Sequence, residues 1–498
     1  MPAATGTAPT GAEQVRRGVE EFFRSCQRPA VIEPGEPAIE LAGGGCTLTV
    51  EGAAVLLEAW DATRFTRRRL RAITGRKPGR LALEIERFGG ASGELVLADL
   101  ARPGGELARR HGVRLEFRER FRRSLARQFA GWKIAELTSG QDLEHSLSPV
   151  YPRAFLKQGQ HAWAAIGAVP GSAGGAIAFG LIWLDYLRRR EHRLSVDGLA
   201  LLLPRGEEVA TCLRLRCLSA SAARFAVFVY DDAHSEERVD PADHGNLDTR
   251  LEPCRQPVAP LEWVQPLLSP AGADIVAGCD GSLSFRVHGL EFARQSGGKL
   301  LFGIDQRQPA GPHHRREIES LTRDMARLRS PDAHDRANPL WRRSAEAWLE
   351  SEVRRHLEAV DATLLPDPVY GQAPVVAGSD RGVLDLLAVD RSGRLAVIEI
   401  KASEDLHLPI QALDYWMRVR WHAGRDEFRS LGYFPGIALK PEPPRLLLVA
   451  PALEFHPTTE NLLGFFDHAI EVERIGVGVE WRKDLKVVLR IRGARRPA

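Results

Sequence analysis

Short apolar runs and periodic stretches divide this chain into regions with different expected structure. Apolar runs at 46–50 and 81–85 predict strands in the first hundred residues. An apolar residue at every fourth position from Phe117 to Phe129 then predicts an amphipathic helix. Residues 1–14, which are rich in Ala, Thr, Gly and Pro, predict a disordered tail instead.

The middle of the chain continues with the same kinds of pattern. A run rich in Ala, Gly and large apolar residues over 173–187 predicts a buried helix, and 199–203 predicts a buried strand. Residues 232–260 are acidic, polar and interrupted by proline, so we expect a linker or long loops there. Beyond it, the pattern predicts strands over 282–287 and 299–304 and an exposed helix over 316–329.

The last third has the clearest pattern, in which helices and wholly apolar strands follow one another. Two of its strands are joined by the turn 390–393, and Ser344 is a candidate cap for its first helix. The order of elements predicts an α/β domain with a mixed sheet flanked by helices. The expected elements are a helix over 344–360, strands over 383–389 and 395–401, a helix over 409–421 and a strand over 445–450.

A chain of 498 residues is too long for one ordinary domain, so we expect several. After the tail, the composition shifts predict an N-terminal α+β region over 15–109, a domain over 110–235, a linker with a small β-containing region over 236–335, and a final domain over 336–498. The net charge is only +3, so a nucleic-acid surface would have to be local. The six cysteines form no CxxC pair, which favours neither a zinc module nor a disulfide framework.

The sequence also bears on where the protein acts. Its first residues lack a basic segment followed by an apolar run, and its longest apolar run, 176–184, is too short to cross a bilayer. We therefore expect a cytoplasmic protein that does not enter the membrane.

Three charged residues interrupt the apolar strands of the last domain. Asp385 lies within the run 383–389, and Glu399 and Lys401 lie on one face of the next strand because they are two residues apart. The tight turn between the strands allows Asp385 to approach Glu399. Two buried carboxylates repel each other unless a cation lies between them, and oxygen ligands suit Mg²⁺ or Mn²⁺. The sequence therefore predicts a divalent metal site with a lysine beside it.

This pattern resembles the PD-(D/E)XK, or restriction-endonuclease-like, nuclease superfamily. Asp385 is followed by Glu399-Ile400-Lys401, although Leu384 stands where the name-giving proline would be. The next helix carries Gln411 and Tyr415, which resemble the QxxxY motif of the RecB-like branch, and the preceding helix carries Glu346. Glu350, one turn later, is the alternative for that helical glutamate. The resemblance covers about 340–455.

The resemblance implies a metal-dependent nuclease, with DNA as the expected substrate. Asp385, Glu399 and the backbone carbonyl of Ile400 would hold Mg²⁺, and Glu346 would complete the shell. Lys401 would act on the attacking water or on the phosphate. Gln411 and Tyr415 would position nucleic acid or support these residues, and Arg418, one turn further on, is a candidate phosphate contact.

Other interpretations fit parts of the same pattern. Asp385 and Lys401 would also be compatible with a buried structural ion pair, although Glu399 would then lack a partner. The chain could be a nucleic-acid-binding scaffold with an inactive nuclease fold, which the intact set of acids and lysine disfavours. In a third alternative it is a structural or regulatory protein whose N-terminal domains bind a partner or a small molecule.

A basic stretch over 64–80 is a second candidate for nucleic-acid contact. It contains no acid, and such a run can follow a phosphate backbone. A solvated helix face would give the same composition. The candidate contacts are Arg64, Arg67, Arg68, Arg69 and Arg71.

A comparison of the chain with itself suggests a repeat. Leu-Asp-Tyr occurs at 184–186 and again at 413–415, each time on an expected helix that precedes a leucine-rich strand closed by proline. We therefore expect that 110–235 form a second, degenerate nuclease-like domain. It would lack activity because 161–167 contain neither an acid nor a lysine.

Overall fold

A computed structural model describes residues 11–33, 38–41, 45–51, 54–60, 65–86, 92–231, 235–268, 273–376 and 383–495. The protein is a mixed α/β chain with several sheets. It divides into two compact units, one made mainly of 1–141 and the other mainly of 173–498. No helix among the described residues is long and apolar enough to span a membrane.

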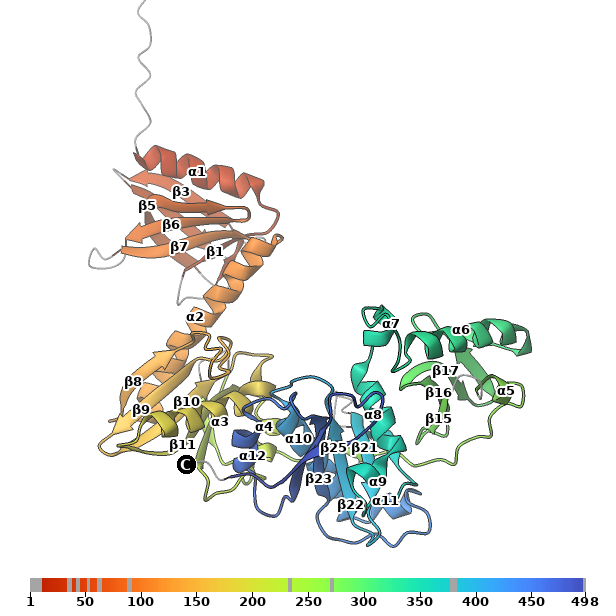
Figure 1. The fold of residues 1–498 in the computed structure, drawn as a ribbon. Coiled ribbons are helices and arrows are strands. Elements are labelled where there is room, and N and C mark those ends of the chain that lie inside the picture. Colours follow the sequence, from red (N-terminus) through yellow and green to blue (C-terminus); the bar gives the residue numbers. More distant parts are fainter. Residues whose placement is uncertain are drawn as a thin grey trace, which may run out of the picture. The chain divides into compact units, whose positions relative to one another are not determined.

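The first unit contains a seven-stranded antiparallel sheet in the order β2-β1-β7-β6-β5-β4-β3 (Figure 1). Helix α1 (Gly11–Ser25) covers it by burying Val15, Val19 and Phe22 against strand residues such as Leu57. The expected tail over 1–14 is therefore wrong at its end, because residues 11–14 open α1, and 1–10 lie outside the described residues. The strands are β1 (Pro29–Ile32), β2 (Ile39–Glu40), β3 (Gly45–Glu51), β4 (Ala54–Trp60), β5 (Phe65–Lys77), β6 (Arg80–Glu86) and β7 (Ser92–Asp99).

The basic stretch forms strands in this sheet, so the helical alternative for it is wrong. It makes up β5 and the start of β6, and the neighbouring segments bring acids to its arginines. Arg68 pairs with Glu33 at 2.7 Å, and Arg71 pairs with Glu86 across the β5–β6 ladder. Arg64 and the side chain of Arg67 lie outside the described residues, whereas Arg69 is exposed.

The first unit ends with a long helix and a hairpin. Helix α2 (Pro103–Gln128) buries Phe117, Phe121 and Leu125, which confirms the expected amphipathic helix. An antiparallel pair follows it, made of β8 (Lys133–Thr138) and β9 (Arg153–Gln158).

The second unit begins with a parallel arrangement of strands and crossover helices. Its strands lie in the order β10-β11-β12-β13, with β11 parallel to β12 and β13 antiparallel to β12. Wholly apolar runs such as 199–203 form the buried strand that parallel sheets require. The elements are β10 (His161–Gly167), α3 (Ala173–Arg190), β11 (Ser195–Pro204), α4 (Val209–Leu215), β12 (Arg224–Tyr230) and β13 (Glu236–Val239).

A small antiparallel sheet follows, in the order β15-β16-β17-β18-β19, with its core against α6 (Arg315–Leu328). The turn His288-Gly289 joins β16 to β17 with both residues at positive φ. A side chain at Gly289 would collide with the Ala347 carbonyl, since its Cβ would lie 1.9 Å from that oxygen. The turn therefore fixes the small sheet against the helix that carries Glu346. The strands are β15 (Asp274–Ala277), β16 (Leu283–Val287), β17 (Leu290–Ser296), β18 (Lys299–Phe302) and β19 (Gln308–Ala310).

The C-terminal sheet has seven strands in the order β14-β20-β21-β22-β23-β24-β25. Strands β22, β23 and β24 are parallel, and β21 and β25 are antiparallel to their neighbours. Its first strand comes from the expected linker, which therefore is not all loop. The strands are β14 (Arg250–Leu251), β20 (Tyr370–Val376), β21 (Val383–Val389), β22 (Leu395–Ile400), β23 (Arg445–Pro451), β24 (Val472–Val477) and β25 (Val487–Arg492).

Helices flank this sheet, in line with the expected mixed α/β class. The expected helix over 344–360 is split at His356 into α8 (Ala345–Arg355) and α9 (Leu357–Val360). Ser344 occupies the expected N-cap position of α8, in the left-handed region at φ 50°, but its side chain makes no capping bond. Helix α10 (Leu408–Ala423) follows β22, and the short helix α12 (Thr459–Gly464) joins β23 to β24.

Candidate active site

Strands β21 and β22 bury apolar residues on both faces, and Asp385 and Glu399 interrupt one of these faces. Leu386 of β21 and Ile398 and Ile400 of β22 belong to the buried cluster beneath α8. Residues in between point to the opposite face, because successive side chains of a strand alternate. Asp385 and Glu399 therefore share the face of the sheet that α10 contacts.

The hydrogen-bonded ladder between β21 and β22 ends just before Asp385 and Glu399. Its pairs run from Val389 with Leu395 to Leu386 with Ile398. At the next position the Ile400 N–H donates to Asp385 Oδ2 at 2.8 Å. The N–H and C=O of one strand residue point to the same edge, so the Ile400 carbonyl faces this opening as well. Two carboxylates and a backbone carbonyl thus converge where the strands separate.

Both carboxylates are held in a place that disfavours their charge. Burial raises the pKa of Asp385 to about 7, despite the Ile400 N–H and the nearby Lys401 ammonium. Burial raises the pKa of Glu399 well above its usual range, and the charge of Asp385 adds to the effect. Glu399 is 3% exposed, and its Oε2 has no hydrogen-bond partner. A buried acceptor without a donor is costly, so this site needs a proton or a cation.

Lys401 connects the acids to helix α8. Its Nζ lies 2.7 Å from Glu346 Oε1 and 3.6 Å from Glu399 Oε1. Burial disfavours the ammonium, but the bond to Glu346 and the neighbouring carboxylates outweigh it and raise the pKa of Lys401. Lys401 therefore remains a cation at neutral pH.

The choice between the two helical glutamates favours Glu346. Glu350 is buried, accepts a bond from Arg354 Nη2 at 3.0 Å, and lies 3.6 Å from Arg286. Glu346 is half exposed and contacts the lysine of the site. Both glutamates place a negative charge near Asp385, with Glu350 the larger effect on its pKa, but Glu346 is the one that contacts Lys401.

Helix α10 presents one face to the acids. Gln411, Tyr415 and Arg418 lie on one side of the helix because residues three and four apart are neighbours. Burial raises the pKa of Tyr415 to about 12, and the charges of Glu399 and Asp385 contribute, which places its hydroxyl near them. The Arg418 guanidinium lies 5.9 Å from the Tyr415 ring, whereas Gln411 is exposed.

The donor set fits a hard divalent cation, with an open shell. Among the described residues, no three His, Cys, Asp or Glu side chains are grouped closely enough to hold a metal ion by themselves. Asp385 and Glu399 supply two carboxylates, the Ile400 carbonyl supplies a third oxygen, and Glu346 stays bound to Lys401. Mg²⁺ usually keeps several waters and binds one or two carboxylates, so this incomplete protein shell is compatible with it.

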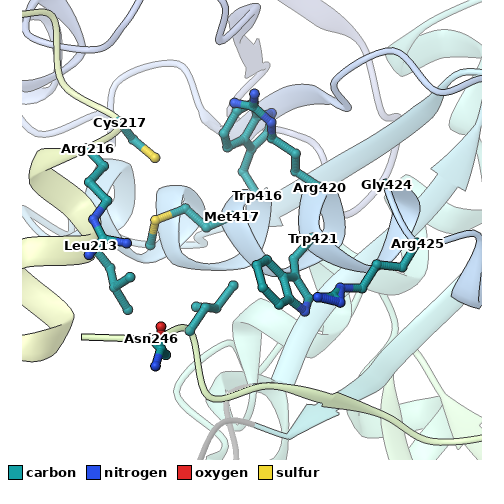
Figure 2. A pocket seen from close by; sticks show the side chains of 11 residues that line it. Leu213, Arg216, Cys217, Asn246, Trp416, Met417, Arg420, Trp421, Gly424 and Arg425 are labelled. Atoms are coloured by element: carbon teal, nitrogen blue, oxygen red, sulfur yellow. The ribbon is translucent and has the colours of Figure 1, made fainter. Parts of the chain in front are cut away.

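The opposite side of α10 faces a pocket of about 420 Å³ (Figure 2). Trp416, Met417 and Trp421 point into it from α10, and Leu213, Arg216 and Cys217 close it from α4 and the segment after it. The Arg425 guanidinium lies 4.1 Å from the Trp421 ring. Successive helical residues are about 100° apart, so the pocket lies about half a turn from Tyr415 and outside the acid site.

The sequence identified the acids and Lys401 but not the bond between Lys401 and Glu346, which joins residues 55 positions apart. No local spacing encodes it. The partners of the N-terminal arginines were missed for the same reason, since Glu33 and Glu86 reach them only through sheet pairing.

The chain was compared with family models, with curated proteins and with solved structures, and none of the three comparisons gave a match.

Proposed function

We propose that this protein is a Mg²⁺-dependent nuclease that hydrolyses phosphodiester bonds in DNA, with Asp385, Glu399 and Lys401 at its centre. The observation that carries the proposal is the Glu399 carboxylate, which is buried beside Asp385 with one oxygen unpartnered. A purely structural pair would leave this charge uncompensated. A cation between the two acids would balance both, and a restriction-endonuclease-like core is the fold class to which such an arrangement belongs.

Each residue has a separate task in the proposed mechanism. The carboxylates of Asp385 and Glu399, together with the Ile400 carbonyl, would hold the ion, and the Ile400 N–H keeps one Asp385 oxygen in place. When bound, Mg²⁺ would polarise the phosphate and make a water more acidic. The charge that develops in the transition state would then be stabilised mainly by groups that are already in place before the substrate binds.

Lys401 would serve as a fixed positive charge rather than as a base. Its ammonium is held between Glu346 and Glu399 and stays protonated. An ammonium in that position attracts the phosphate and stabilises the negative charge that develops on it. Glu346 would orient Lys401, so it is a positioning residue as well as a possible outer ligand of the ion.

The α10 face would receive the substrate. Arg418 would contact a phosphate, Tyr415 would close the site above the acids, and the exposed Gln411 would lie at its outer edge. DNA is the substrate class that the resemblance implies. RNA carries the same phosphates, so the assay must include it.

The test is a cleavage assay on single-stranded, double-stranded and branched DNA and on RNA, with Mg²⁺, Mn²⁺ or EDTA. We expect cleavage of at least one DNA form with either metal and none in EDTA. Cation binding, measured by calorimetry with Mn²⁺ alone, should disappear in Asp385→Asn and Glu399→Gln.

Glu358→Gln is the matched control, because Glu358 is an exposed acid of the same domain that pairs with Arg391 at 3.7 Å. It should bind Mn²⁺ and cleave as the unmodified chain does. Nucleic-acid binding without cleavage under every metal condition would replace the proposal with a non-catalytic scaffold.

A further inference from the structure

Two segments of the second unit have the same succession of elements. The N-terminal segment, 161–239, runs β10, α3, β11, α4, β12, β13, and the C-terminal segment, 395–492, runs β22, α10, β23, α12, β24, β25, with one further short helix, α11 (Glu427–Ser430), between α10 and β23. In each, the strands lie in sequence order, the second and third are parallel, and the fourth is antiparallel.

The strand register agrees as well. Strands β11 and β23 both end in proline, and Pro204 pairs with Tyr230 as Pro451 pairs with Val477. The partner lies the same distance along the chain in both segments, from 204 to 230 and from 451 to 477. The helices before these strands both carry Leu-Asp-Tyr, at 184–186 and 413–415.

The two segments contact each other through matching parts. The residues after α4 pair antiparallel with the residues after α12, and the Leu218–Phe466 bridge is flanked by Ser219 N–H to Phe465 O at 2.8 Å and Asp467 N–H to Cys217 O at 2.9 Å. Leu218 and Phe466 each lie six residues before the next strand, which begins at Arg224 and at Val472.

The helices of the two segments also contact each other in a reciprocal way. Helix α4 packs on α10, and α12 packs on α3, so each segment offers its short helix to the long helix of the other. Arg214 of α4 donates to Asp414 of α10 at 2.8 and 2.7 Å. A face that contacts its own equivalent is the sign of a two-fold interface, as in a homodimer.

Only the C-terminal segment carries an acid in its first strand and a lysine directly after it. Strand β10 contains neither Asp, Glu nor Lys, whereas β22 contains Glu399 and is followed by Lys401. The N-terminal segment therefore occupies the docking face that a second catalytic domain would need, without supplying a second site.

We propose that the chain is an internal pseudo-dimer with a single active site, and that it cuts one strand of a duplex and leaves the other intact. The N-terminal segment takes the place of a second protomer and supports the uncut strand. This inference rests on the proposed nuclease function.

The test is a single-turnover reaction of the full chain with supercoiled plasmid and Mg²⁺. We expect nicked circles, with linear DNA at least tenfold slower to form. A separate multiple-turnover reaction has plasmid in excess over all protein. There, adding Asp385→Asn chain in excess over the active chain should leave the cleavage rate per active chain unchanged. Linear product formed as fast as nicks would overturn the inference alone. Absence of both cleavage and duplex binding would overturn the proposed function and the inference with it.

The interface has its own test, which needs no catalysis. The flanking bonds make Leu218 and Phe466 a closely spaced pair with an expected Cα separation of about 4.5 Å, within the range that a disulfide bridges. In a Cys217→Ser background, L218C/F466C should form an internal disulfide on mild oxidation, seen by mass spectrometry, and L218C or F466C alone should not. Failure of the double variant to cross-link, while it remains folded and monomeric, would overturn the docking.

Discussion

The N-terminal segment and the C-terminal segment of the second unit share strand order, register and crossover helices, but they differ at the ends of their central strands. Strand β10 ends in small and apolar residues, whereas β22 ends in Glu399 and Ile400 and is followed by Lys401. The end of β10 therefore buries no charged side chain. The end of β22 keeps Glu399 away from water with one of its oxygens unpartnered. The contrast suggests that a parallel α/β scaffold is set by its apolar pattern, and that a few charged side chains decide whether it can hold a cation.

The largest expected effect comes from removing the charges of the site, two of which the C-terminal segment carries and one of which, Asp385, lies on the strand before it. Asp385→Asn, Glu399→Gln and Lys401→Met should each reduce cleavage at least ~100-fold, because each removes a fixed charge from the place where negative charge develops. Initial rates under saturating Mg²⁺ measure this. Melting curves should show folded proteins for all three, and Glu358→Gln should retain full activity.

The second effect concerns the contact that joins the segments. Arg214→Glu should lower the free energy of unfolding by ~3 kcal/mol, since it leaves Asp414 facing a like charge in a place largely closed to water. The exchanged pair, Arg214→Glu with Asp414→Arg, should recover part of that loss. Denaturant unfolding of the unmodified chain, Arg214→Glu, Asp414→Arg and the exchanged pair gives the coupling energy between the two residues. A value near zero would mean that this ion pair does not hold the segments together.

The third effect is a pH dependence that only the acid-bearing segment should cause. The pKa of Asp385 is raised to about 7 in the folded chain, so folding takes up a proton there between pH 4 and 7. As far as this group is concerned, stability in EDTA should be highest at and below pH 4, and should fall by about 4 kcal/mol between pH 4 and about 7.

Asp385→Asn is the control for that pH dependence, because it removes one titrating group and should make the profile less steep between pH 4 and 7, while Glu399 still contributes. Mg²⁺ binds ionised carboxylates, so it should restore part of the stability that the unmodified chain loses as the pH rises. Identical profiles of the two chains in EDTA would show that Asp385 is not the group that titrates.

The smallest effect is expected in the first unit. Since Arg71 pairs with Glu86, we expect R69Q/R71Q to change duplex affinity less than twofold and to leave its salt dependence unaltered. Arg418→Gln should instead reduce the slope of affinity against salt concentration by about one phosphate contact. Fluorescence anisotropy at several salt concentrations distinguishes them, and a lower slope for R69Q/R71Q would restore the basic strand as a binding surface.

The sequence predicted elements well where one apolar pattern filled a whole strand or helix. Strands β21 and β23 and helix α10 lie within a few residues of their expected bounds, because continuous apolar runs and the turn 390–393 fix them. Strand β17 was missed, since its polar residues face neighbours that only the hairpin turn His288-Gly289 brings close. The basic strand β5 was open to two interpretations, because charge along a chain does not show which acids lie across the sheet.

The candidate site was predictable to the extent that a charged residue inside an apolar strand is conspicuous. Asp385 and Glu399 were identified in that way. The assignment of the helical glutamate was not settled by spacing, because Glu346 and Glu350 are one turn apart. The arginines that contact Glu350 already compensate its charge, which favours Glu346, and one of them, Arg286, comes from the small sheet rather than from the same helix.

Helix α10 has consequences for how the protein tolerates mutation. One side carries Tyr415 near the acids, with Arg418 beside it, and the other carries Asp414 at the contact with α4 and Met417 and Trp421 at the pocket wall. A helix used on both sides leaves few positions where a change is neutral. A substitution in α10 is therefore expected to disturb catalysis, docking or both, and over evolutionary time this helix should change more slowly than the exposed helix α6, which is buried along only one stripe.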